Sequence, residues 1–108
     1  MMSTNTKREV ARVAAHLGLE NIPEDWAGID VVLPLLERMR SEGAVVVLKL
    51  DGQRVGIDDN GPYTVIVSGG GMGNDFARRD AHSLEEGLAV TILEYATRVW
   101  RYRARPQG

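Results

Sequence analysis

The residues with the greatest capacity for chemistry stand together in the segment FARRDAHS at positions 76–83. Alternate residues of a strand share a face, so an extended segment would place Arg78, Asp80 and His82 on one side. Arg79 would then face the other way. In a catalytic arrangement Asp80 would orient His82 as a general base, and Arg78 would hold an oxyanion or a phosphate. The same residues also fit an anion-binding or partner-binding surface, and their simplest interpretation is surface charge.

A second candidate group, WRYRAR at positions 100–105, interleaves aromatic side chains with arginines. Aromatic rings stack on bases and guanidinium groups neutralise phosphates, so this composition favours nucleic-acid binding. The alternative is structural, because the helix dipole stabilises cations at a helix C-terminus and aromatic rings can belong to the core or to a dimer contact. The candidate nucleic-acid residues are Arg98, Trp100, Arg101, Tyr102, Arg103 and Arg105.

Two further motifs lack the spacing that their chemistry requires. The glycines of positions 69–73 follow an apolar run, but a dinucleotide fingerprint needs glycine at Asn74 and a helix that begins at the loop. We therefore interpret the glycine segment as a mobile connection between strands. The turn at positions 58–62 has Val67 where a calcium loop carries its glutamate. We expect no cofactor, no metal and no catalytic constellation.

Size and composition indicate one soluble domain over residues 1–108, with residues 1–5 and 104–108 as disordered tails. The chain is 44% hydrophobic and 26% charged, which is ordinary for a globular protein. Its lack of cysteine excludes disulfides, thiol nucleophiles and thiolate metal sites. The first residues lack the apolar core of a secretory signal and no stretch reaches membrane length, so we expect a cytoplasmic protein without membrane contact.

The N-terminal third predicts two helices. Thr6 and Glu9 match a capping box, and the helix that they open should end before Gly18. Trp26 stands in a connection and should anchor it to the core. Asp30 can cap a second helix that runs to about Ser41, with Pro34 either tolerated among its first residues or marking a later start.

The rest of the chain predicts strands and a long helix. The valine-rich residues 44–50 run into Asp51-Gly52, a pair typical of a tight hairpin turn, with a return strand over residues 53–57. Residues 63–68 form the next strand, and residues 76–81 form a weak edge strand. Ser83 and Glu86 make a capping box for a helix whose apolar residues recur at steps of three and four: Leu84, Leu88, Ile92, Tyr95 and Val99.

This order predicts an α+β fold: a two-layer sandwich in which an antiparallel meander of three or four strands is covered by the long C-terminal helix and one or two N-terminal helices. The helix, meander and helix of the second half resemble double-stranded RNA-binding domains in element order. That family grips phosphate with lysines at the start of its last helix, where this chain has Ser83-Leu84-Glu85-Glu86. The strand, loop and LEEGL opening is similar to HicB-type antitoxins.

Three classes of function are compatible with these observations. The first is a small non-enzymatic module, of bacterial or phage type, that acts by protein–protein contact, including as a homodimer through a sheet edge or the long helix. The second is nucleic-acid binding through the arginines of the C-terminal stretch. The third is an anion-binding or hydrolytic site around Arg78, Asp80 and His82.

Overall fold

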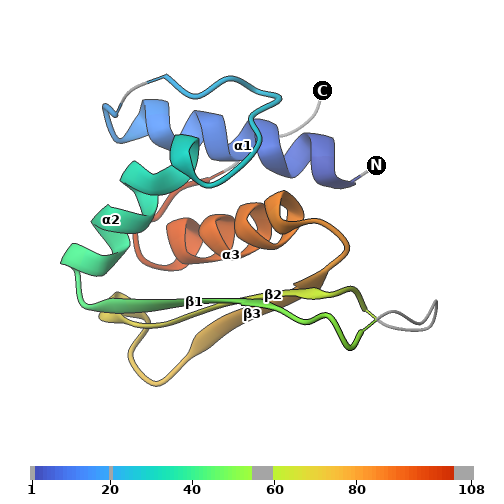
Figure 1. The fold of residues 1–108 in the computed structure, drawn as a ribbon. Helices are drawn as coiled ribbons and strands as arrows, with labels where there is room; N and C mark the ends of the chain where they lie inside the picture. Colours follow the sequence, from blue (N-terminus) through green and yellow to red (C-terminus); the bar gives the residue numbers. More distant parts are fainter. Residues whose placement is uncertain (1, 20, 55–59, 104–108) are drawn as a thin grey trace.

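The computed structural model describes residues 2–19, 21–54 and 60–103 and shows an α+β fold (Figure 1). Two short 3-10 turns, η1 and η2, accompany three helices and three strands in this part of the chain. The helices are α1 (Met2–His16), α2 (Leu33–Ser41) and α3 (Leu84–Arg98). The strands are β1 (Ala44–Leu50), β2 (Tyr63–Gly69) and β3 (Phe76–Ala81), and the turns are η1 (Asp30–Val32) and η2 (Gly70–Met72).

The strands form one antiparallel sheet in the order β1-β2-β3, and the helices lie on one side of it (Figure 1). Helix α3 packs on β2 and β3, α2 packs on β1, and α1 packs against α3 (Figure 1). The predicted α+β class and the order α-α-β-β-β-α are confirmed.

Helix α3 forms the centre of the core, as its spacing predicts. Ser83 is its N-cap and accepts a hydrogen bond from the amide of Glu86 at 3.1 Å. Leu88, Ile92 and Tyr95 are fully buried between α1 and the sheet. A Cβ atom at Gly87 would lie 2.8 Å from Val65, so glycine allows the helix to approach β2 closely.

The N-terminal helices differ from prediction at their starts. Helix α1 begins at Met2, four residues before the expected cap at Thr6, and thus within the segment predicted as a tail. The prediction that Asp30 caps a second helix is wrong, because residues 30–32 form η1 and Pro34 is the second residue of α2. Proline is favoured in the first turn, where its missing N–H costs nothing. Trp26 is buried and donates to the carbonyl of Lys7 at 3.0 Å, as expected of an anchor.

The predicted hairpin at Asp51-Gly52 is wrong. Strand β1 pairs with β2 directly, from Ala44 opposite Gly69 to Leu50 opposite Tyr63. Gln53 and Arg54 belong to the connection between β1 and β2 and not to a strand. The Asp51 carboxylate accepts a hydrogen bond from the Gln53 amide at 2.9 Å, which stabilises a local turn there. Residues 55–57 of the predicted return strand, residues 58–59 of the predicted turn and the predicted tail at 104–108 lie outside the described residues.

The glycine segment is packed against the core. Met72 of η2 is 7% exposed and belongs to the core. Cβ atoms at Gly70 and Gly71 would lie 2.8 Å from the Tyr95 hydroxyl and 2.7 Å from Val99, respectively. Close packing therefore explains Gly70 and Gly71. The segment connects β2 to β3, as predicted, but Met72 packs on the core where the prediction placed the segment outside it.

Candidate functional site

The face of the sheet that points away from the helices has no cover within the described part of the chain (Figure 1). We call this surface the open face. Strand register places its residues in three rows across β1, β2 and β3. The rows are Val45, Ser68 and Phe76, then Val47, Ile66 and Arg78, then Lys49, Thr64 and Asp80.

Apolar side chains dominate the first two rows. Val45, Val47 and Phe76 are 56%, 45% and 60% exposed, and Ile66 between them is half-buried. The solvated face of an antiparallel sheet ordinarily carries polar residues. An apolar group in that position is the kind of surface that a partner covers.

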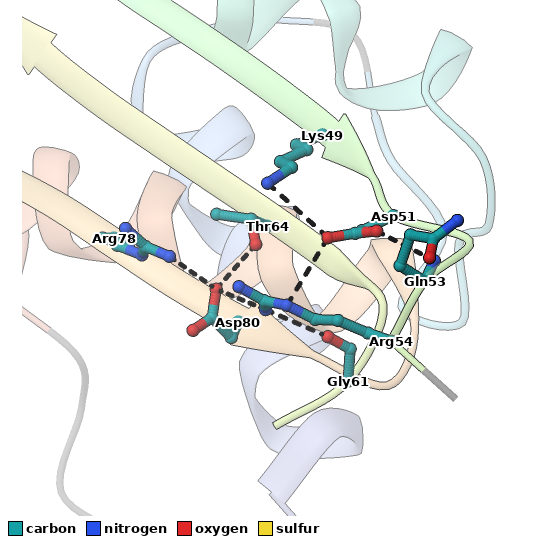
Figure 2. Close-up of polar contacts among 8 residues, drawn as sticks. All are labelled: Lys49, Asp51, Gln53, Arg54, Gly61, Thr64, Arg78 and Asp80. Carbon is teal, nitrogen blue, oxygen red and sulfur yellow. Dashed lines mark hydrogen bonds and ion pairs between the residues drawn. The ribbon is translucent and has the colours of Figure 1, made fainter. Parts of the chain in front are cut away.

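The polar end of the open face is organised around Asp80 (Figure 2). Its Oδ1 accepts a hydrogen bond from the Thr64 hydroxyl at 2.6 Å and lies 3.4 Å from nitrogen atoms of both Arg54 and Arg78. Thr64 is 2% exposed, so its hydroxyl is fixed within the sheet. Side chains from two strands and one connection thus meet at one carboxylate.

Asp51 is the second carboxylate of this network (Figure 2). It lies 3.6 Å from Lys49 Nζ and 3.7 Å from Arg54 Nε. Arg54 therefore bridges Asp51 and Asp80, and it also donates to the carbonyl of Gly61 at 3.3 Å. Lys49, Arg54 and Arg78 carry three positive charges and the two carboxylates carry two negative charges, so the polar end has a net charge of +1.

Hydrogen bonding favours the ionised form of both carboxylates. The Thr64 hydroxyl, followed by the charges of Arg78 and Arg54, lowers the pKa of Asp80 below its ordinary value of 3.8. The Gln53 amide is the main cause that lowers the pKa of Asp51. A carboxylate whose pKa is lowered is a weaker proton acceptor, so the network fits a structural role better than general-base catalysis.

All four predicted residues, Arg78, Arg79, Asp80 and His82, line one surface hollow, together with Asn60, Ala81 and Glu86. Arg79 faces the helix side, as alternation predicts, and its Nη2 lies 3.1 Å from Glu86. His82 is exposed, and it forms no hydrogen bond or ion pair with the residues that the structure describes. Thr64, Arg54 and Arg78 all contact Oδ1 of Asp80, and His82 makes no hydrogen bond or ion pair with this carboxylate, so the predicted orientation of His82 by Asp80 is not present.

The aromatic side chains of the C-terminal stretch have structural roles. Trp100 Nε1 donates to the Glu42 carboxylate at 2.9 Å, and Tyr102 is 7% exposed and donates to Glu9 at 2.6 Å. These hydrogen bonds hold Trp100 and Tyr102 against the helices. Helix α3 ends at Arg98, whose guanidinium lies 3.3 Å from Asp75 and 3.1 Å from Glu94.

The arginines beyond α3 do not share a helix face. Arg101 adopts a left-handed conformation with φ of 57°, and both Arg101 and Arg103 are exposed. Arg105 lies outside the described residues. Within the described ranges, no cluster of three or more histidine, aspartate or glutamate side chains could hold a metal ion. The helices described there are also too short or too polar to cross a membrane.

Sequence reasoning found Arg78 and Asp80 but missed the other members of the polar end. Lys49, Asp51 and Arg54 stand in one short stretch, but they reach Thr64 and Asp80 only when β1 pairs with β2, and the predicted hairpin hid that pairing. Comparison of the chain with protein-family models, curated proteins and solved structures found no match. The resemblances noted from the sequence therefore remain similarities of element order.

Proposed function

We propose that this protein is a small non-enzymatic binding module that acts through protein–protein contact on the open face of its sheet. The observation that carries the proposal is the exposure of Val45, Val47 and Phe76 on a face that no described helix covers. The charges beside them already satisfy one another, so a partner can cover this face without leaving an unpaired ion. A cytoplasmic location, expected from the sequence, belongs to the same proposal.

The long helix is a poor alternative for such a contact. Leu88, Ile92 and Tyr95 of α3 are fully buried inside the molecule, between α1 and the sheet. A dimer through α3 would require the protein to open. The open face needs no rearrangement, which favours it as the contact surface.

A second copy of the chain is the partner that best fits the open face. If a two-fold axis runs parallel to the strands between two stacked sheets, β1 of one copy lies over β3 of the other. Val45 then faces Phe76 of the second copy, and Ile66 faces its own equivalent. Lys49 faces Asp80 of the second copy, so the charges are complementary as well.

Sedimentation velocity at protein concentrations from about 10 µM to about 1 mM tests this proposal. We expect a concentration-dependent dimer for the natural chain and a monomer for Val47→Lys, which would place a lysine opposite Arg78 of the second copy. Leu33→Lys is the matched control, because Leu33 is 43% exposed but lies on α2, away from the open face. A natural chain that stays monomeric, or a Leu33→Lys variant that dissociates equally, would contradict the homodimer.

A further inference from the structure

A second surface, remote from the open face, has the composition of an anion site. The end of α1 and the segment after α3 line an open hollow of about 630 Å³, within the size range of small-molecule sites. We call it the C-terminal hollow. Its lining residues are Arg12, Ala15, His16, Arg101, Tyr102 and Arg103.

The charges of Arg101 and Arg103 distinguish the C-terminal hollow from the rest of the described surface. Every other arginine that the structure describes lies within 4.0 Å of a carboxylate, whereas these two have no such partner among the described residues. The paired arginines are Arg8, Arg12, Arg38, Arg40, Arg54, Arg78, Arg79 and Arg98. Unpaired guanidinium groups that line one concave surface create a positive potential that attracts anions.

The floor of the C-terminal hollow is rigid. Tyr102 donates from its hydroxyl to Glu9 Oε1 at 2.6 Å, and Arg12 lies 2.6 Å from Oε2 of the same carboxylate. The His16 ring meets the Tyr102 ring edge-on at 5.8 Å. Arg101 and Arg103 flank a fixed residue, so less conformational entropy is lost when they bind a ligand.

Three of the last carbonyl groups of α1 are already bonded within the chain. The carbonyls of Val13, Ala14 and Ala15 accept the amides of residues 17, 19 and 18 at 3.0, 2.9 and 3.1 Å. These bonds satisfy acceptors that a helix C-terminus otherwise presents to solvent. The ionisable side chains that line the hollow are Arg12, His16, Arg101, Tyr102 and Arg103.

We propose that the C-terminal hollow binds a phosphate group through Arg101 and Arg103, with Arg12 and His16 at its wall. Guanidinium groups match phosphate because their paired N–H donors reach two of its oxygens at once. A small phosphorylated molecule and the backbone of a single-stranded nucleic acid present the same group. This inference is independent of the contact proposed for the open face.

Isothermal titration with sodium pyrophosphate at low ionic strength tests the site. We expect saturable binding by the natural chain, and at least about tenfold weaker binding by the double variant Arg101→Gln with Arg103→Gln. Arg40→Gln is the matched control, since Arg40 is exposed but paired with Glu37 at 2.7 Å. All three replaced side chains are exposed, and circular dichroism checks that each variant folds.

A second titration, with a single-stranded oligonucleotide, distinguishes the source of the phosphate. Tighter binding than pyrophosphate, with an affinity that falls steeply with salt, would assign the site to nucleic acid. Equal or weaker binding would assign it to a small phosphorylated molecule. The proposal fails if pyrophosphate does not bind at about 1 mM, or if Arg40→Gln weakens binding as much as the double variant does.

Discussion

The polar end of the open face and the C-terminal hollow both contain arginines, but they use them differently. Arg54 lies near two carboxylates and Arg78 near one, whereas Arg101 and Arg103 have none among the described residues. Charges that pair within the molecule fix its structure and present a nearly neutral surface. Charges left unpaired remain free for a ligand, which is why we assign protein contact to the first region and phosphate binding to the second.

The largest expected effect on stability comes from adding a side chain at Gly61, which lies beside the polar end of the open face. A Cβ atom at this residue would lie 2.0 Å from the carbonyl oxygen of Ala81, and its φ of 110° is unfavourable for other residues. We expect Gly61→Ala to lower the free energy of unfolding by about 3 kcal/mol or more, measured by urea denaturation. Gly52→Ala is the control, because its Cβ would meet nothing within 4 Å. Equal effects of the two substitutions would contradict this packing.

The C-terminal hollow should be sensitive to loss of one hydroxyl group. We expect Tyr102→Phe to lower the free energy of unfolding by about 1.5 kcal/mol, because the Glu9 carboxylate loses its hydrogen bond at 2.6 Å. Tyr63→Phe should change it by less than about 0.5 kcal/mol, since Tyr63 is half-buried and its side chain has no hydrogen bond to a described residue. Chemical denaturation of both variants measures the difference. A stable Tyr102→Phe protein would mean that the floor is not fixed as described.

The open face should also make folding sensitive to acid. The pKa of Asp80 is lower in the folded protein than in the unfolded chain, chiefly because of the Thr64 hydroxyl. Its contribution to stability is therefore present above the ordinary pKa of 3.8 and is lost as pH falls through the lower folded value. We expect the melting temperature of Asp80→Asn to depend less steeply on pH below about 4 than that of the natural chain. Parallel curves for the two proteins would exclude this role of Asp80.

The smallest expected effect concerns a charge outside both regions. Arg40 and Glu37 form an exposed ion pair one helical turn apart on α2. We expect Arg40→Gln to change the free energy of unfolding by less than about 0.5 kcal/mol, as is typical of surface pairs. A thermal melt at low and high salt checks this value. A larger change would show that this exposed ion pair contributes more to stability than surface pairs usually do.

The sequence was informative where one local signal decided the structure. The Ser83 cap, the apolar spacing of α3 and the valines of β1 each predicted their element correctly. Local signals were insufficient where a distant residue decided. A turn does form at Asp51-Gly52, where the Arg54 amide donates to the Asp51 carbonyl at 3.2 Å, but the strand that pairs with β1 is β2. The packing of Gly70 and Gly71 in η2 could not be predicted for the same reason, because their neighbours Tyr95 and Val99 lie on α3.

The candidate sites, too, could be predicted only where the arrangement depends on a single segment of the chain. Alternation along β3 correctly put Arg78 and Asp80 on one face, since that requires only the strand itself. The C-terminal stretch was identified as cationic, but the burial of Tyr102 depends on Glu9, which is 93 residues away in the chain. Periodicity within a segment cannot reveal such a partner.

Amide nuclear magnetic resonance spectra test the separation of the two regions most directly. We expect dilution of the protein to shift the amides of Val45, Val47 and Phe76, and pyrophosphate to shift those of Arg101 and Arg103. Each treatment should leave the other set unchanged. A pyrophosphate titration that moved the amides of Arg54 and Arg78, and left those of Arg101 and Arg103 in place, would contradict this separation.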